Sequence, residues 1–177
     1  MNDLRKFIGE AVSMLVLNSP LPVAQVKEAE CLVIKRPPHD SWKPNYFSPV
    51  TGHIEERDIE YLKTFPEPWT VEKLYVGTGK REFSEELKRS PSVFSLRHIG
   101  KYHDDETNYN VAVLSGEIYG AGTTVEKLVI PRIQPTKEAP EVHWMTVEQI
   151  QKIIEENKFA GKKSFEMFFE DLKRFNH

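Results

Sequence analysis

Arg81-Glu82-Phe83-Ser84-Glu85-Glu86-Leu87 places three carboxylates and an arginine within seven residues. On a helix, positions 82, 85 and 86 share one face, and positions 83 and 87 share the neighbouring apolar face. Like charges at this spacing repel one another, so the pattern favours a cation among them. Arg81 is one such cation. A divalent metal ion such as Mg²⁺, which takes oxygen ligands, is another.

Other readings of this region are weaker or remain open. A Glu-rich helix face is commonly plain solvated surface, in which case the stretch does no chemistry. Just upstream, Gly77-Thr78-Gly79-Lys80 looks like the end of a phosphate-binding P-loop, but Leu74 stands where that loop needs glycine and Arg81 where it needs Ser or Thr. The chain also has no Gly-x-Ser-x-Gly and no His-Glu-x-x-His sequence, so neither a serine hydrolase nor that type of zinc protease is indicated.

Composition describes an ordinary folded chain. With 177 residues, 39% hydrophobic and 11% aromatic, it predicts a single domain over residues 1–177 with its own core. A net charge of −3 gives no support for a general nucleic-acid binder. Cys31 is the only cysteine, which excludes an internal disulfide and a thiolate zinc site and favours a reducing, cytoplasmic setting. No apolar run approaches the roughly 20 residues of a membrane span.

Local patterns predict the elements around the acidic helix. Apolar residues at helical spacing predict an N-terminal helix over about residues 3–17. Thr78 is the expected N-cap of the acidic helix. Thr146 and Gln149 form a capping-box pattern that opens a later helix, and a last helix follows Gly161. Strands are predicted at 32–34, 93–99, 109–114, 127–130 and 141–145, a loop at 39–49, and a short helix at 58–65.

Residues 81–86 resemble the helical core of the Nudix box. The pattern of that box is Gly, five residues, Glu, seven residues, Arg-Glu-apolar-x-Glu-Glu, one residue, Gly and an apolar residue. Gly52-His53-Ile54-Glu55 is similar to the turn that opens the box, and residues 141–146, leading into a helix, are similar to the closing strand and helix of the family. The resemblance spans about residues 31–157.

The chain also departs from this pattern. Asp58 occupies the first Glu position, and 22 residues separate it from Arg81 where the family has seven. An insertion is therefore placed at about residues 57–77. Lys88 stands where the box has glycine, and Arg89 where it has an apolar residue.

The resemblance implies an α/β fold, a Nudix-like α/β/α sandwich with a mixed central sheet. It implies a hydrolase, a Nudix-type diphosphohydrolase (pyrophosphatase) that cleaves a phosphoanhydride bond in a nucleoside diphosphate linked to another moiety. Mg²⁺, or Mn²⁺ in its place, would be held by the three helical carboxylates and the backbone carbonyl of the opening turn: Glu82, Glu85, Glu86 and Gly52. Arg81 would orient a neighbouring carboxylate.

The family supplies the general base variably, so it stays open between Glu82 in the box and a later loop residue, Glu138 or Glu141. Trp42 and Tyr46 in the aromatic loop are the expected substrate-binding residues, against the alternative that they cover core. A nucleotide-type small molecule is the expected partner, capped RNA and a homodimer are left open, and no membrane is expected. The rival readings are a Nudix-fold nucleotide-binding or regulatory protein without turnover, and an acidic α+β interaction domain that binds no nucleotide.

Overall fold

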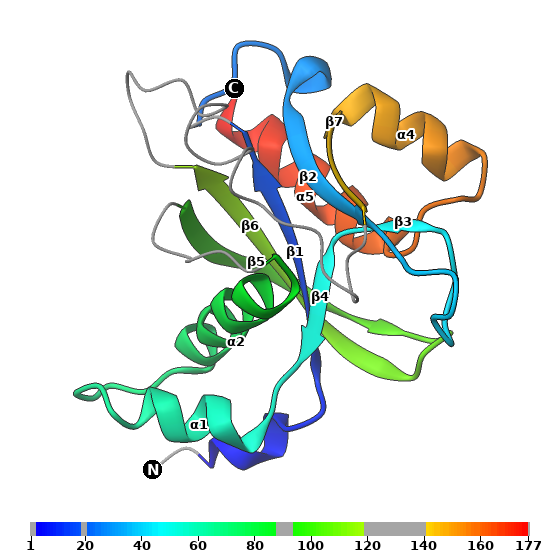
Figure 1. Ribbon diagram of the computed structural model, residues 1–177. Coiled ribbons are helices and arrows are strands. Elements are labelled where there is room, and N and C mark those ends of the chain that lie inside the picture. Colours follow the sequence, from blue (N-terminus) through cyan, green and yellow to red (C-terminus); the bar gives the residue numbers. More distant parts are fainter. Residues whose placement is uncertain (1–2, 19–20, 88–93, 119–140, 177) are drawn as a thin grey trace.

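A computed structural model describes residues 3–18, 21–87, 94–118 and 141–176, and the described strands form one mixed sheet (Figure 1). Its main path runs β3-β2-β1-β6-β5, with β4 paired to β1 and β7 paired to β2. β1 and β6 are parallel, and the other pairs are antiparallel. The strands are β1 (Ala11–Leu17), β2 (Glu30–Lys35), β3 (Phe47–Ser48), β4 (Val50–His53), β5 (Phe94–Asp104), β6 (Tyr109–Ile118) and β7 (Glu141–Thr146).

Helices cover both faces of this sheet. The helical elements are η1 (Leu4–Phe7), η2 (Val26–Glu28), α1 (Glu56–Leu62), α2 (Val71–Leu87), α4 (Val147–Glu155) and α5 (Lys162–Phe175). Val12, Met14 and Val16 of β1 pack in one apolar cluster with residues of α1 and α2. Leu15 and Leu17 of β1 pack in a second cluster with residues of α4 and α5. The predicted α/β/α sandwich with a mixed sheet is therefore confirmed.

The predicted N-terminal helix over residues 3–17 is wrong. Only Leu4–Phe7 form a short 3-10 helix, Gly9 turns the chain at φ +87°, and Ala11–Leu17 form β1 at the centre of the sheet. Six of the seven residues of β1 are buried, because helices pack on both faces of the strand. A strand buried on both faces is a continuous apolar run without alternation, so its spacing imitates a helix.

The acidic helix exists but begins earlier than expected. α2 starts at Val71, and Thr78 is fully buried inside it, so the prediction of Thr78 as its N-cap is wrong. Gly79 lies where a Cβ would come within 2.6 Å of Leu114 and 2.8 Å of Met14. The helix therefore packs tightly on the sheet at Gly79, and this glycine marks a close contact with the sheet instead of a break.

Later elements agree with the sequence. β2, β6 and β7 contain the strands predicted at 32–34, 109–114 and 141–145, while β5 extends from the predicted 93–99 region through Asp104. Thr146 and Gln149 form both bonds of the expected capping box before α4. The strand predicted at 127–130 lies outside the described residues. None of the helices in the described part of the chain is long and apolar enough to cross a membrane.

Next to the candidate site, strand β1 has two different pairing partners, β2 and β4, on the side away from β6. β2 pairs with β1 at the end of that strand, through Leu17 and Cys31. β4 pairs with the beginning of β1, and Gly52 faces Val12 in that register. The two partners of β1 therefore occupy opposite ends of the strand, and the segment that joins β2 to β4 runs beside the predicted opening turn of the box.

Candidate functional site

Gly52 and Glu82 bring the two halves of the predicted box together. A Cβ built at Gly52 would lie 1.9 Å from the Cδ of Glu82 and 2.2 Å from its Oε1. Only glycine leaves room for the Glu82 carboxyl group against β4. The turn and the acidic helix, predicted separately from sequence, therefore meet at van der Waals distance.

Arg81 is the centre of an ion-pair network at this contact. Its Nε donates to Oδ1 of Asp58 at 2.6 Å, and its Nη2 donates to Oδ2 of the same residue at 3.0 Å. Its Nη2 also donates to the His53 carbonyl oxygen at 2.8 Å and lies 2.7 Å from Oε1 of Glu82. Its Nη1 donates to Oε2 of Glu85 at 2.8 Å. The expectation that Arg81 pairs with a neighbouring carboxylate is confirmed.

Asp58, at the first Glu position of the box, reaches Arg81 despite the 22 residues between them. The rest of α1, the connection 63–70 and the first turns of α2 take up those residues and return the chain to the same place. The Asp58 side chain is 4% exposed, and its Oδ2 also accepts the backbone N–H of Glu55. The inserted segment therefore leaves the contact between turn and helix intact.

The pKa values of Glu82 and Arg81 are shifted in this network. Burial raises the pKa of Glu82 above its ordinary value; the charges of Glu85 and Asp58 act in the same direction, and Arg81 opposes them. Burial alone would lower the pKa of Arg81, but its hydrogen bond to Asp58 and the charges of Glu82, Asp58 and Glu85 raise it above its ordinary value. Arg81 is therefore a permanent cation among these carboxylates.

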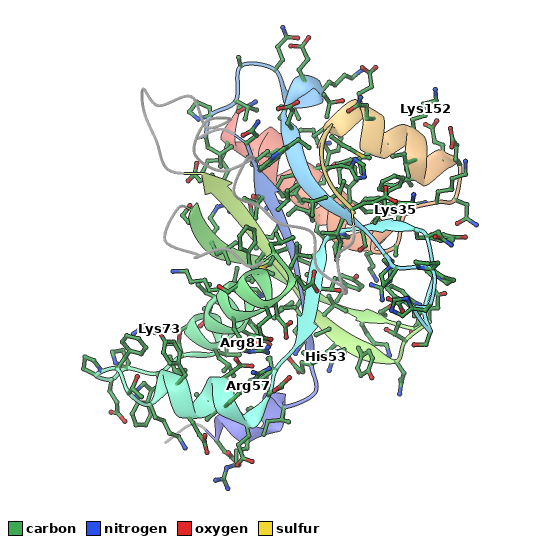
Figure 2. All side chains as sticks on the ribbon, in the orientation of Figure 1. Lys35, His53, Arg57, Lys73, Arg81 and Lys152 are labelled. Carbon is green, nitrogen blue, oxygen red and sulfur yellow. The ribbon has the colours of Figure 1, made fainter. Side chains whose placement is uncertain are left out.

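The three helical carboxylates line one cavity of about 670 Å³, which we call the carboxylate cavity. Glu86 is buried there, while the Glu85 side chain is 40% exposed. In Figure 2, Arg57 and Arg81 lie between α1, α2 and β4, with His53 at the end of β4. The lining consists of Ile34, Arg36, Pro37, His39, Asp40, Ser41, Thr51, Gly52, His53, Glu55, Arg57, Arg81, Glu82, Glu85 and Glu86.

The donor set of this cavity fits a hard divalent cation. Glu82, Glu85 and Glu86 offer carboxylate oxygens, and Gly52 adds its backbone carbonyl oxygen. Glu82 can lie this close to Gly52 because glycine has no Cβ. As the side chains stand, no group of three His, Cys, Asp or Glu residues in the described part of the chain is placed to hold a metal ion. Both oxygens of Glu85 instead accept hydrogen bonds from arginines. A metal ion at Glu85 would therefore compete with these arginines for the carboxylate.

A second cavity of about 780 Å³, the aromatic cavity, shares six lining residues with the first: Arg36, Asp40, Ser41, Thr51, Gly52 and His53. Trp42 lines it, with the Arg36 guanidinium 4.9 Å from its ring centroid. Its wall also includes Tyr102, Tyr109, Lys43, Lys162 and Lys163. The shared residues show that the two cavities adjoin, and that the second adds aromatic and basic side chains to the site.

Solved structures share the fold of this chain over almost its whole length. A NUDIX hydrolase from Alicyclobacillus acidocaldarius matches 93% of this chain and 90% of its own, at 15% identity and a TM-score of 0.64. The chain has the Nudix hydrolase fold. The Caenorhabditis elegans Ap4A hydrolase, solved as a binary complex, matches 94% of this chain and 100% of its own at 15% identity and a TM-score of 0.54.

The Nudix fold is also found in a domain solved in a protein complex. The C-terminal domain of mouse MUTYH, solved with human PCNA, matches 93% of this chain and 89% of its own at 16% identity and a TM-score of 0.52. No family model matches the chain, and no curated protein sequence matches it. At these identities the likeness shows the Nudix fold alone.

Two predicted site residues lie away from both cavities of this Nudix fold. Tyr46, although described by the structure, is not among the residues that line them, and its carbonyl accepts the Arg36 N–H. Glu141 lies on β7, where it pairs with Lys35 at 2.9 Å, and it too is absent from both linings. Glu138 lies outside the described residues.

Sequence reasoning missed two contributors to the carboxylate cavity. Arg57, next to Asp58 in the box count, donates to both oxygens of Glu85. Arg36 forms an ion pair with Asp40 at 2.6 Å and lines both cavities. Arg57 stands one residue before Asp58, the first acid of the box, and this position could have marked it as a site residue. No sequence pattern pointed to the pairing of Arg36 with Asp40.

Proposed function

We propose that this protein is a Nudix-type diphosphohydrolase that uses Mg²⁺ or Mn²⁺ to cleave a phosphoanhydride bond in a nucleoside diphosphate linked to another moiety. The observation that carries the proposal is the convergence of Gly52, Glu82, Glu85 and Glu86 on one cavity. These oxygen donors, gathered beside three arginines that line the same cavity, suit a hard metal ion with phosphate. The single cysteine, Cys31, is free and buried, which accords with a cytoplasmic setting.

In this proposal the carboxylates of Glu82, Glu85 and Glu86 and the Gly52 carbonyl hold the metal. The bound ion neutralises phosphate charge and makes water a stronger nucleophile. Arg81 is a positioning residue: it bonds Glu82 and Glu85 and is itself fixed by buried Asp58. The carboxylates of Glu82 and Glu85 are therefore oriented before the substrate binds.

For the general base we favour Glu82 over Glu141. Glu82 lies in the carboxylate cavity, within the group of acids proposed to hold the metal, whereas Glu141 lines neither this cavity nor the aromatic cavity. The pKa of Glu141 is lowered, mainly by its hydrogen bond with Lys35, which holds it as a weak base. The nucleoside end of the substrate would stack on Trp42 in the aromatic cavity.

A nucleotide-binding protein without turnover is the second candidate. The observation that favours it is Glu85, whose two oxygens already accept hydrogen bonds from Arg57 and Arg81. If these arginines kept the metal out, the cavities would bind phosphate and base without cleaving.

The test incubates the protein with Mg²⁺ or Mn²⁺ and nucleoside triphosphates, ADP-ribose, dinucleoside polyphosphates, sugar nucleotides and capped RNA, and follows product release. We expect turnover that falls by about 100-fold or more in Glu86→Gln, because loss of a metal ligand removes several kcal/mol of charge stabilisation. Glu56→Gln, an exposed change on α1, is the matched control and should retain activity. Nucleotide binding without turnover would favour the second candidate, and neither binding nor turnover would refute both.

A further inference from the structure

Arg57 comes from the first turn of α1 and reaches across to α2. Its Nη1 donates to Oε1 of Glu85 at 2.9 Å, and its Nη2 donates to Oε2 at 3.3 Å. On its other side, its Nε donates to Oε2 of Glu55 at 2.7 Å, and its Nη2 donates to Oε1 at 3.2 Å. The guanidinium therefore bridges two carboxylates at the edge of the carboxylate cavity, which it lines.

Both arginines hold Glu85, a proposed metal ligand. Its Oε1 accepts from Arg57, and its Oε2 accepts from Arg81 at 2.8 Å as well as from Arg57. A metal ion at Glu85 would share these oxygens with the guanidinium groups and would be repelled by their positive charge. Release of one arginine therefore favours metal binding.

The two arginines differ in how readily they can leave. The Arg81 side chain is 16% exposed and is also held by Asp58, Glu82 and the His53 carbonyl. The Arg57 side chain is 52% exposed and bonds only the two glutamates among the described residues. An exposed ion pair contributes little free energy, whereas a buried one is expensive to break. Arg57 is therefore the arginine that a metal ion displaces.

Glu55 determines where Arg57 stays after that exchange. Its two bonds to the guanidinium do not involve Glu85, so they can retain Arg57 at the cavity when Glu85 turns to the metal. A guanidinium released there presents donors that match two oxygens of a phosphate group. The incoming divalent charge repels it from the metal ligands and toward any phosphate bound beside them.

We propose that Arg57 holds Glu85 in place of the metal in the free protein, is displaced when the metal binds, and then binds a phosphate of the substrate from its tether on Glu55. This inference rests on the proposed function for the metal and the phosphate. It assigns Arg57 two opposite effects: it weakens metal binding and strengthens phosphate binding.

The test measures Mn²⁺ affinity by electron paramagnetic resonance, in the absence of substrate, for wild type, Arg57→Ala and Arg5→Ala. Arg5 is exposed and forms an ion pair at 3.8 Å with Glu56, which lies next to Arg57 on α1. Arg5→Ala therefore controls for the loss of one positive charge. We expect Arg57→Ala to bind Mn²⁺ about two- to fivefold more tightly than Arg5→Ala, the gain expected for removal of an exposed pair. Equal or weaker binding in Arg57→Ala overturns the inference.

The second arm measures binding of methylenediphosphonate, a diphosphate that cannot be hydrolysed, by calorimetry at saturating Mn²⁺. We expect weaker binding to Arg57→Ala than to wild type, and partial recovery in Arg57→Lys, which restores charge but not two-point bonding. A damaged fold would weaken the binding of both Mn²⁺ and methylenediphosphonate. Tighter Mn²⁺ binding together with weaker methylenediphosphonate binding therefore distinguishes the proposed role of Arg57 from a damaged fold. No binding to wild type, or equal binding to wild type and Arg57→Ala, overturns the inference.

Glu86→Gln separates this inference from the proposed function. If Glu86→Gln binds Mn²⁺ as wild type does, the proposed metal site itself is wrong. If Glu86→Gln loses Mn²⁺ while Arg57→Ala and Arg5→Ala bind it equally, the metal site stands and only the role of Arg57 is wrong.

Discussion

Two cavities border α2, and they differ in the chemistry of the side chains that line them. The carboxylate cavity is lined by acids and arginines joined in one network around Arg81. The other, of about 710 Å³, which we call the insertion cavity, has mainly apolar walls and two exposed aromatics, Tyr61 and Phe65. Its lining is Asp58, Tyr61, Leu62, Phe65, Pro66, Trp69, Glu72, Lys73, Val76, Gly77, Lys80, Arg97 and His98.

The difference shows that two faces of α2 are under different constraints. On the face turned to the sheet, Gly79 and Phe83 pack tightly, and on the face at the carboxylate cavity Arg81 and Glu85 are ion-paired. On the face that lines the insertion cavity, a Cβ at Gly77 would meet nothing within 4 Å. Asp58 joins the two regions, because it lines the insertion cavity while its carboxylate holds Arg81. Substitutions in the carboxylate cavity should therefore strongly reduce stability or turnover, whereas substitutions in the insertion cavity should have small effects.

Asp58→Asn tests the link between the cavities and should have the largest effect. It removes the negative charge that pairs with Arg81 in a buried setting, where breaking an ion pair costs about 3–5 kcal/mol. We expect a loss of about 3 kcal/mol in the free energy of unfolding, measured with urea. Glu72→Gln, on the insertion side, should change it by less than about 0.5 kcal/mol. Similar losses in the two variants would contradict the comparison.

Gly52→Ala tests the carboxylate cavity alone. The new Cβ would overlap the Glu82 carboxyl group and push it out of place. Because misplacement of a reacting group by about 1 Å can cost roughly 100-fold in rate, we expect turnover to fall by about that factor. Steady-state kinetics would measure it, with circular dichroism to show that the fold is kept. Full activity would mean that the position of Glu82 does not matter.

Gly77→Ala should have the smallest effect and a stabilising sign. Alanine in a helix interior is favoured over glycine by about 0.5–1 kcal/mol, and the space at Gly77 is open. Gly79→Ala, two residues on, should destabilise, because its Cβ would press on Leu114 and Met14. Urea unfolding of the pair would measure both signs. Equal signs would show that these two faces of α2 are packed alike.

Prediction from sequence succeeded where the signal was local. Thr146 and Gln149 cap α4 within four residues, and the last helix, α5, begins directly after Gly161 as expected. It failed at β1, whose apolar run has no alternation because both its faces are covered. It failed also at Thr78, because a glycine-rich stretch suggests a break unless the sheet beneath it is known.

For the site, the sequence by itself determined the chemistry: Glu82, Glu85 and Glu86 share a helix face because of helical periodicity, and the spacing from Gly52 singled out Asp58. Only the tertiary structure decided which groups meet. The Arg81 contact with Asp58 spans 23 positions and that of Arg57 with Glu85 spans 28, and both depend on how α1 packs against α2. Periodicity fixes neighbours within one element, whereas contacts between elements depend on packing that no local pattern encodes.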